Sequence, residues 1–453
     1  MRDSTNLTPP EISDLIAAGK VESLVETLSH FHPADLADFM EHLGEEDAAN
    51  LFHALPEDRR VETFELLEED RQLNLIEHVG LTFMAPVIDR MSPDDRADLV
   101  KNLPPRTTER LLPLLAQAER ADVKRLLAYP EETAGAIMST GYANIGPDLS
   151  VAESLELLRR IAPHRETIYY VYVTGPEREL LGFVSLQDLI LAEPTQSISS
   201  LMNTDVISLP ASSDQEEVAK HMEKYNFLAL PINDERGRLV GIVTHDDILD
   251  VVEVEATEDA HLMGAVAPLE NPYFRTSFHS LAWKRGSWLS LLFLAEMFTS
   301  TALHEFEGTL SGALSLVFFI PLIISSGGNS GSQSATLITR GLAVGDVTLQ
   351  DWWRVTLREL GMGIFLGIFL AGLAFTRAWW VESDYLIAST VGLTMVGIVL
   401  FGTLVGSLLP LVFKRFGWDP AVTSSPFVAS LVDIFGIVLY MNIAYQLMGS
   451  PTP

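Results

Sequence analysis

Asp433, an acidic residue inside a long apolar segment, is the strongest candidate for a functional residue in this chain. Asp433 is the only charged side chain between residues 427 and 448. An ionisable group in a membrane-length apolar stretch is costly unless it faces a pore or a partner. Because this stretch has no Lys, Arg or His, a cation is the natural partner. Ser425, Ala429 and Asp433 are spaced i, i+4 and i+8, so a helix places them on one face.

A second polar feature interrupts another apolar segment. Residues 318–336 read FFIPLIISSGGNSGSQSAT, with Gly327, Gly328 and Asn329 at the start of the polar run. The run predicts a broken helix and a carbonyl-lined pore wall, because irregular backbone at membrane depth is tolerated only in protein or around a wet cavity. A polar loop just outside the membrane is the alternative. Glu296, in a further apolar segment, is either a pore residue or an interhelical hydrogen-bonding group.

Five apolar segments contain these residues, and each is near or above the roughly 17–25 residues that a helix needs to cross a bilayer. They are residues 286–303, 310–326, 360–376, 385–413 and 427–448. Buried helices of a soluble core are the alternative, which so many long segments disfavour. Lys and Arg cluster on one side of the predicted spans. This predicts a multi-pass protein of the cell (inner) membrane, with cytoplasmic N-terminal domains and the C-terminal tail outside.

Charge separates this apolar part from an acidic part before it. The chain has 61 acidic and 30 basic side chains, a net charge of −31, and nearly all of the excess precedes residue 268. This balance argues against nucleic acid as a partner, since nucleic-acid binding needs clustered cations. The absence of cysteine excludes disulfides, thiolate metal sites and a cysteine nucleophile.

The acidic part contains a repeat of roughly 60 residues. Residues 181–190, LGFVSLQDLI, match residues 240–249, VGIVTHDDIL, position by position. The pattern resembles the cystathionine-β-synthase-type (CBS) domain pair, which often holds an adenine nucleotide. The resemblance implies a nucleotide site, with ATP as a candidate, at Ser185, Asp188, Thr244 and Asp247. Helix capping is the alternative role of these residues, because Ser, Thr and Asp are preferred N-caps.

Before the repeat, residues 11–128 are predicted to be helical. Three motifs, at residues 32–40, 55–60 and 92–100, each place a proline at the start of an amphipathic helix. Proline suits the first helical position, and acids suit the first turn. Short helices that follow one another in this way indicate a small α-solenoid.

With these parts in order, the whole chain resembles the MgtE family of magnesium channels. The family signature G-G-N-x-G-N-Q-[SA]-A-T appears as GGNSGSQSAT at residues 327–336, and D-P-A…P-x-V-A-[ST]-L-x-D-x-x-G appears within residues 419–436. Ser332 stands where the family usually has Asn, and Ser425 stands where Asn is common.

The resemblance implies a multidomain membrane protein that works as a homodimer, with a Mg²⁺-selective pore between the protomers. The implied parts are an all-α superhelical domain (1–130), an α/β tandem CBS pair (131–253, with units at about 137–200 and 201–253), a plug-like connecting helix (254–280) and five transmembrane helices (281–453). The implied pore site is Asp433, with the Ala429 carbonyl and Gly328 nearby. Asn329 and Ser425 belong to the same predicted pore.

The resemblance also implies a regulatory role for Mg²⁺ in the cytoplasm. The matching sensor positions are Asp94, Asp98, Asp214, Glu216, Asp247, Asp250, Glu255, Glu258 and Asp259. Like charges held together destabilise a compact arrangement, and divalent ions that bridge them favour it. We therefore expect high cytosolic Mg²⁺ to close the pore and low Mg²⁺ to open it. A solvated acidic surface is the alternative for any single acid.

Two other function classes compete with a channel. An ion-coupled secondary transporter of divalent cations would show inverted repeats and paired broken helices, and none is convincing here. A membrane enzyme would need a catalytic constellation, yet the histidines of the apolar part, His279 and His304, lie far from both signatures. The sequence therefore predicts a protein that is not an enzyme.

Overall fold

The computed structural model describes residues 31–269, 271, 273–306 and 314–448. The chain divides into two compact units, residues 1–252 and 253–453, which are described separately. The first residues of the predicted apolar segment 310–326 lie outside the described residues.

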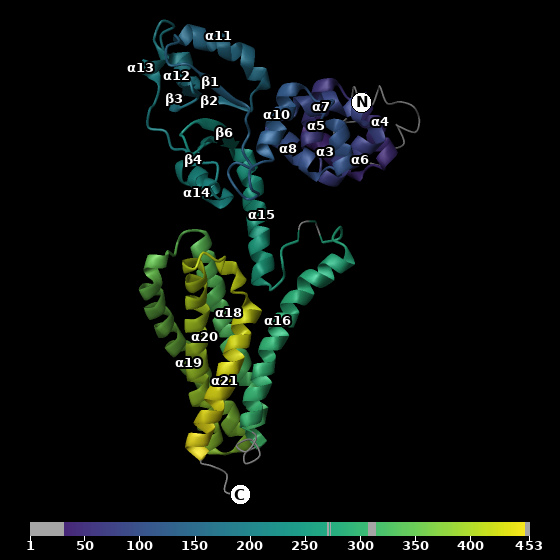
Figure 1. The fold of residues 1–453 in the computed structure, drawn as a ribbon. Coiled ribbons are helices and arrows are strands. Elements are labelled where there is room, and N and C mark those ends of the chain that lie inside the picture. The colour runs from purple at the N-terminus through teal and green to yellow at the C-terminus, as the bar shows by residue number, and fades with distance from the viewer. Residues whose placement is uncertain (1–30, 270, 272, 307–313, 449–453) are drawn as a thin grey trace, which may run out of the picture. The chain divides into compact units, whose positions relative to one another are not determined.

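The first unit begins with short helices in a stack (Figure 1). They are α3 (Pro33–His42), α4 (Glu45–Ala54), α5 (Glu57–Glu65), α6 (Glu69–Val79), α7 (Leu81–Arg90), α8 (Pro93–Asn102), α9 (Pro105–Leu111) and α10 (Gln117–Leu126). From α3 to α10, helices two apart in sequence pack together, as in a solenoid. Pro33 and Pro93 occupy first-turn positions, and Pro56 caps α5. Leu36, Phe52 and Phe64 are fully buried in the shared core.

Two similar α/β repeats follow. The first contains β1 (Tyr142–Ile145), α11 (Val151–Ile161), β2 (Thr167–Thr174), β3 (Leu180–Ser185) and α12 (Leu186–Leu191), and a short α13 (Ile198–Leu201) comes next. The second contains β4 (Leu209–Pro210), α14 (Gln215–Tyr225), β5 (Ala229–Asn233), β6 (Leu239–Thr244) and α15 (His245–Met263). In each sheet the first strand is parallel and the third antiparallel to the central one. Gly182 and Gly241 hold equivalent register positions, opposite Val173 and Ile232.

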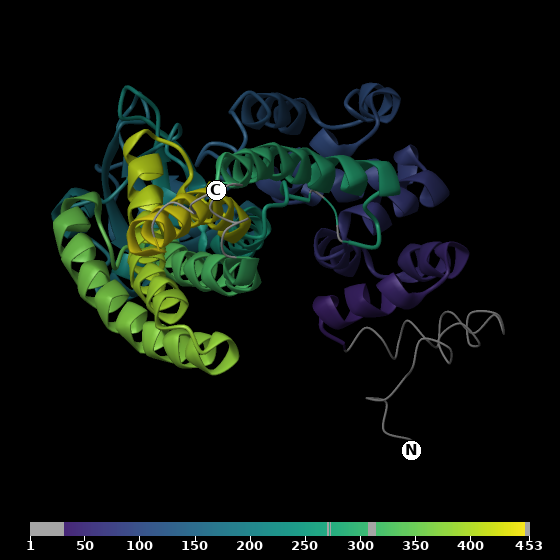
Figure 2. The ribbon, with the colours of Figure 1, turned by 90° about the horizontal axis from the view of Figure 1, so that it is seen from below.

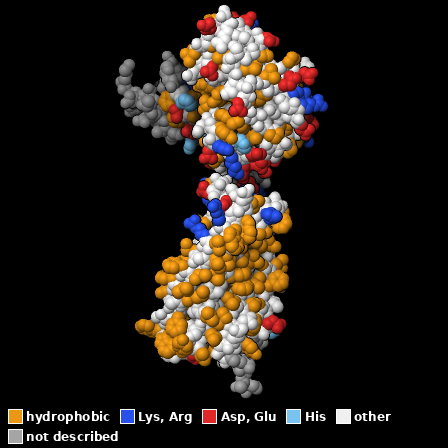
Figure 3. Space-filling model, turned by 90° about the vertical axis from the view of Figure 1, so that its left-hand side faces the viewer, with side chains coloured by type: hydrophobic (Ala, Val, Ile, Leu, Met, Phe, Trp, Pro, Cys, Tyr) orange, Lys and Arg blue, Asp and Glu red, His pale blue; other side chains and the backbone are white. Residues whose placement is uncertain are grey.

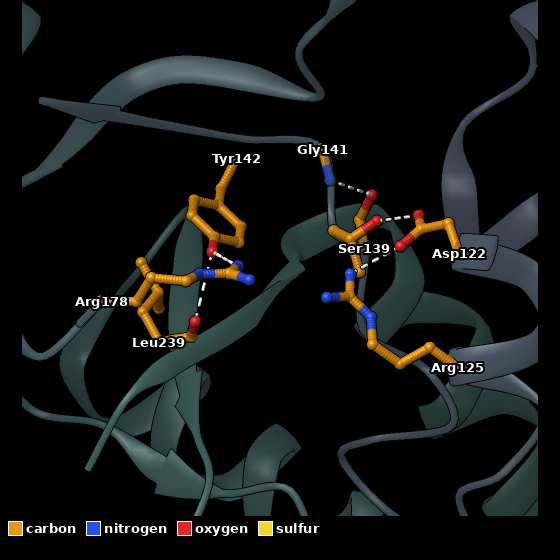
Figure 4. A network of polar contacts seen from close by, with 8 residues as sticks. Asp122, Arg125, Ser139, Gly141, Tyr142, Arg178 and Leu239 are labelled. Atoms are coloured by element: carbon orange, nitrogen blue, oxygen red, sulfur yellow. Dashed lines mark hydrogen bonds and ion pairs between the residues drawn. The ribbon is translucent and has the colours of Figure 1, made fainter. Parts of the chain in front are cut away.

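Polar contacts join α10 to the chain just before β1 (Figure 4). Asp122 accepts a hydrogen bond from Thr140 and pairs with Arg125 at 2.5 Å. Between the two α/β repeats, the Tyr142 hydroxyl accepts a hydrogen bond from Arg178 and donates to the Leu239 carbonyl oxygen at 3.2 Å. These bonds tie the helical stack to the first repeat and the first repeat to the second.

The second unit consists of long helices (Figures 1 and 2). They are α16 (Phe278–Glu305), α18 (Ile320–Ala343), α19 (Trp352–Glu382), α20 (Tyr385–Arg415) and α21 (Ser425–Met448). Among the described residues, the four from α18 to α21 are long and apolar enough to cross a membrane. The 28-residue α16 is long enough as well, at about 42 Å, but it is not among the four. A fifth span therefore remains a prediction.

The glycine-rich segment does not break its helix, so the predicted break in the helix is wrong. Helix α18 runs without interruption through Gly327, Gly328 and Gly331. Its glycines permit close packing: a Cβ on Gly406 of α20 would fall onto the Gly331 carbonyl oxygen, and one on Gly402 would fall onto that of Gly327. The glycines that indicate irregular backbone in the sequence instead let two helix backbones touch.

The face of the second unit seen in Figure 3 is largely apolar, with Lys and Arg gathered towards one end. Phe365, Phe369 and Trp380 of α19 are exposed. Lys414 at the end of α20 donates a hydrogen bond to the Leu342 carbonyl oxygen at 3.1 Å, so the C-terminal ends of α18 and α20 meet. Apolar side chains on the surface and basic ones at an end are what a membrane-spanning unit requires.

We predict that Gly406→Ala destabilises the second unit by about 1–3 kcal/mol, because the new methyl group must push α18 and α20 apart. Thermal unfolding of the purified protein in detergent measures this as a lowered Tm. Gly372→Ala on α19 is the matched control, since nothing lies within 4 Å of its added Cβ. Equal melting temperatures for the two variants would contradict the close approach of α18 and α20.

Candidate functional site

The site around Asp433 is built by α18 and α21, which pack side by side. Asp433 lies eight residues into α21, about 12 Å along its axis, and Ala429 lies one turn before it. Helix α18 brings Gly328 to the same place: a Cβ on Gly328 would lie 3.4 Å from the Ala429 Cβ and 4.0 Å from Asp433 Oδ1. The structure therefore brings together three of the predicted pore residues, and the absent side chain at Gly328 leaves Asp433 room.

The other two predicted pore residues occupy different surroundings. Asn329 is exposed on α18, and its Nδ2 donates to Ser325 Oγ at 3.4 Å. Ser425 is the first residue of α21, and its carbonyl oxygen accepts a hydrogen bond from Ser332 Oγ at 3.2 Å. The two positions that depart from the family pattern, Ser332 and Ser425, thus contact each other.

Helix α18 carries an exposed polar face. Asn329, Gln333 and Thr336 follow at helical spacing and are exposed. Ser332, Gln333, Thr336 and Leu337 line an open cavity of about 400 Å³. Polar groups on a membrane helix must be covered by protein or face water. This face of α18 therefore needs either a protein cover or contact with water.

Glu296 of α16 also reaches Asp433. The two carboxyl groups lie within hydrogen-bonding distance of each other, and α16 packs against α21. Helix α21 itself carries no basic side chain. Within the described parts of the chain, no three acidic or histidine side chains are arranged to hold a metal ion by themselves. A cation at Asp433 would therefore need water, backbone oxygens or a second chain to complete its ligands.

A second group of acids lies in the first unit, where α8 meets the start of α15 and the chain before β2. Asp94 of α8 is 7% exposed, and its Oδ1 has no hydrogen-bond partner. Burial raises the pKa of Asp94 well above its usual value, and the nearby carboxylates of Asp247 and Glu166 raise it further. We call Asp94, Asp95, Glu166, Asp246 and Asp247 the acidic contact.

Two further members of the acidic contact are held by hydroxyl groups. Ser139 Oγ donates to Glu166 Oε2 at 3.1 Å, and Thr244 Oγ1 donates to Asp247 Oδ2 at 2.6 Å. Burial raises the pKa of Glu166 to about 7 and that of Asp247 to about 6. Each shift has the same origin, which is negative charge placed away from water among other negative charges.

The remaining predicted sensor acids are more dispersed. Asp98 is one turn beyond Asp94 on α8, and burial raises its pKa to about 6. Asp214 caps α14, and Glu216 in the first turn of that helix pairs with Lys220 at 2.5 Å. The others lie along α15, and they are Asp250, Glu255, Glu258 and Asp259. Burial raises the pKa of Asp95, and the nearby carboxylates of Asp246 and Asp250 raise it further.

The predicted nucleotide residues cap helices in this structure. Ser185 Oγ accepts a hydrogen bond from the Asp188 backbone N–H at 3.0 Å and donates to Asp188 Oδ2 at 2.6 Å. Asp247 Oδ2 accepts hydrogen bonds from both the backbone N–H and the hydroxyl group of Thr244. In both repeats the hydroxyl group of the Ser or Thr donates to the Asp three residues later. Asp247 also belongs to the acidic contact.

The sequence alone does not single out Glu166, Asp95 or Glu65. Asp95 adjoins Asp94 in the motif at 92–100, and that position is the signal that could identify it. Glu65 Oε1 accepts a hydrogen bond from the Ser92 backbone N–H at 2.7 Å, and burial raises its pKa to about 7. Nothing in the local sequence marks Glu65 or Glu166, because their importance comes from folding against α8.

Family models match most of the described chain. A model described as a divalent cation transporter (MgtE) matches residues 320–443, one described as the MgtE intracellular N domain matches residues 31–132, and CBS domains match residues 134–194 and 198–254. None of these three models describes a catalytic domain.

Two bacterial proteins named magnesium transporter MgtE are similar over most of their length. The protein from Thermus thermophilus is 43% identical over 358 residues, which are 78% of this chain and 79% of that protein. The protein from Bacillus subtilis is 33% identical over 374 residues, 82% of each.

Two solved structures each resemble about half of this chain. The soluble part of a magnesium transporter has a TM-score of 0.52 and 33% identity, covering 55% of this chain and 98% of that one. The cytosolic domain of the Mg²⁺ channel MgtE in complex with ATP has a TM-score of 0.52 and 36% identity, covering 54% of this chain and all of that one.

We predict that a fragment of residues 1–263 loses stability as the pH rises. Glu166 and Glu65 have pKa values of about 7 in the folded protein, above the 4.5 of the free side chain. Between these values the folded state binds more protons than the unfolded state, so the free energy of unfolding falls with rising pH. In metal-free buffer, the Tm should be highest near pH 5 and lowest above about pH 8.

Glu166→Gln tests the origin of this trend, since it removes one titrating group and keeps the hydrogen bond with Ser139. The variant should show a flatter dependence of Tm on pH than the parent fragment. A parent Tm that increases from pH 5 to pH 8 without metal would contradict the assignment.

Proposed function

The chain belongs to the MgtE family of magnesium transporters, and from this premise we propose that it is a Mg²⁺-selective channel that cytosolic Mg²⁺ closes. The observation that carries the proposal is the position of Asp433, beside Gly328 and Ala429 among apolar membrane helices. A carboxylate in that position, on a helix without a basic residue, is compensated by a cation that arrives from solution.

The ion at Asp433 is proposed to keep much of its water. Mg²⁺ is small, prefers octahedral oxygen ligands and gives up water reluctantly. Gly328 places no side chain beside Asp433, and backbone oxygens near Ala429 would supply further ligands. Selection then depends on charge and hydrated size and does not require a fully dehydrating cage.

The pore is proposed to lie between two copies of the chain. The exposed polar face of α18, with Asn329, Gln333 and Thr336, needs a cover in the membrane. A second copy would place the same polar face opposite and enclose a hydrated path with two Asp433 carboxylates. By the positive-inside rule, the end of the second unit where Lys414 meets Leu342 faces the cytoplasm.

Regulation is proposed to act through the acidic contact. Asp94 and Asp247 come from different parts of the first unit, and their charges oppose each other without a cation. Mg²⁺ between α8 and α15 would remove that repulsion and hold the first unit compact. High cytosolic Mg²⁺ then closes the channel, and low Mg²⁺ lets repulsion loosen the contact and open it.

ATP is the cofactor proposed for the CBS pair. The similar cytosolic domain that was solved with ATP supports it, as do Ser185 and Thr244 at equivalent positions of the two repeats. The hydroxyl groups that now bond Asp188 and Asp247 would turn to the nucleotide.

We expect Asp433→Ala to reduce the Mg²⁺ flux by at least about tenfold, because the variant lacks the carboxylate that attracts the cation. Mg²⁺ flux into liposomes that contain the purified protein measures it. Asn442→Ala, an exposed polar position on the same helix, is the control and should conduct like the parent. Unchanged flux and ion preference in Asp433→Ala would refute the pore site.

Mg²⁺ in the millimolar range should protect the first unit from limited proteolysis, and Asp94→Asn should reduce the Mg²⁺ dependence of that protection. Asp35→Asn, which changes an exposed acid of α3 outside the predicted sensor positions, is the control. A second arm with ATP and no Mg²⁺ reports nucleotide binding separately. Digestion at the same rate with and without Mg²⁺ would argue against the sensor.

A further inference from the structure

Helix α16 brings a second carboxyl group to the Asp433 site. Glu296 lies within α16, away from either end, and its carboxyl group is within hydrogen-bonding distance of that of Asp433. Because α16 packs along α21 of the same chain, this contact needs no second copy. Gly328 of α18 also adjoins Asp433, and its missing side chain leaves space beside the carboxyl group.

On the helices that surround the two carboxyl groups, no Lys or Arg lies close in sequence to the residues of the site. There is no Lys or Arg within ten residues of Glu296, and α21 has no Lys, Arg or His. On α18 the basic residue is Arg340, about 18 Å along the axis from Gly328. Two carboxylates in contact repel each other unless positive charge lies between them, and the repulsion is strong where water is scarce.

We propose that Glu296 is a specificity-determining residue of the cation pathway, which forms with Asp433 a two-carboxylate site inside each chain. The inference rests on the proposed function, because it takes Asp433 as a cation ligand. The two negative charges match one divalent cation, whereas a monovalent cation leaves one of them uncompensated. Acidic side chains set the charge preference of cation pathways in this way.

A purely structural role makes a different prediction. If Glu296 only hydrogen-bonds Asp433 to hold α16 against α21, a neutral amide of the same shape can replace it. If Glu296 supplies charge, the amide cannot replace it and a shorter carboxylate can. Glu296→Gln and Glu296→Asp therefore separate charge from hydrogen bonding.

The experiment measures Mg²⁺ and K⁺ flux into liposomes that contain the purified full-length chain. We expect Glu296→Gln to raise the Mg²⁺ concentration for half-maximal flux, and to lower the ratio of Mg²⁺ to K⁺ flux, by about tenfold each. Glu296→Asp should stay within a few-fold of the parent. Glu305→Gln, which changes an exposed acid at the end of the same helix, is the matched control and should equal the parent.

A folded Glu296→Gln protein with the half-maximal concentration and flux ratio of the parent would overturn the inference. Folding is checked by the elution volume and the Tm in detergent. If the Gln variant does not fold, Glu296→Met, an apolar side chain of similar length, must show the same shift or the inference is wrong.

Asp433→Asn, measured in parallel, separates this inference from the proposed function. If Asp433→Asn conducts like the parent, Asp433 is not a pore ligand and both ideas are wrong. If Asp433→Asn loses flux while the Glu296 variants match the parent, the proposed function stands and only the role of Glu296 is rejected.

Discussion

Negative charge held away from water is the constraint on which both units of this protein depend. In the second unit Asp433 lies among apolar helices, and in the first unit Asp94 is buried with an oxygen that has no partner. Burial of such a group is unfavourable unless a positive ion joins it or it takes up a proton. The same physical cost therefore appears in the part that would conduct Mg²⁺ and in the part that would sense it.

The position of Asp433 depends in turn on how closely the backbones of the neighbouring helices approach one another. Gly327 and Gly331 of α18 face Gly402 and Gly406 of α20, and no larger residue fits between these helices. With α18 held against α20 on one side, Gly328 meets Ala429 and Asp433 on another. Small residues thus fix the place of the charged one, although they contribute no charge themselves.

The sequence predicts the parts of this fold better than their contacts. Repeated motifs and apolar length identify the helical stack, the CBS pair and four membrane-length helices, because these follow from local patterns. The continuous helix through Gly327–Gly331 escapes prediction, since glycines that permit packing and glycines that break a helix look alike in one dimension. Glu166 cannot be found from sequence at all, because it becomes notable only where distant segments fold together.

Asp433, in contrast to Glu166, can be identified from the sequence, because it is an acidic residue with apolar residues on either side. Its contact with Glu296 cannot be predicted in the same way, because nothing in either helix specifies which neighbour it meets. Lone charges can therefore be found from sequence, whereas charge pairs across helices require the three-dimensional fold.

The hydrogen bond between Ser332 and the backbone of Ser425 has a consequence for how such chains diverge. These positions lie 93 residues apart in sequence yet share one contact. Exchange of a long amide for a short hydroxyl at one of them alters the space available to the other. Natural selection should therefore change the two sites in concert, so that they covary among homologues.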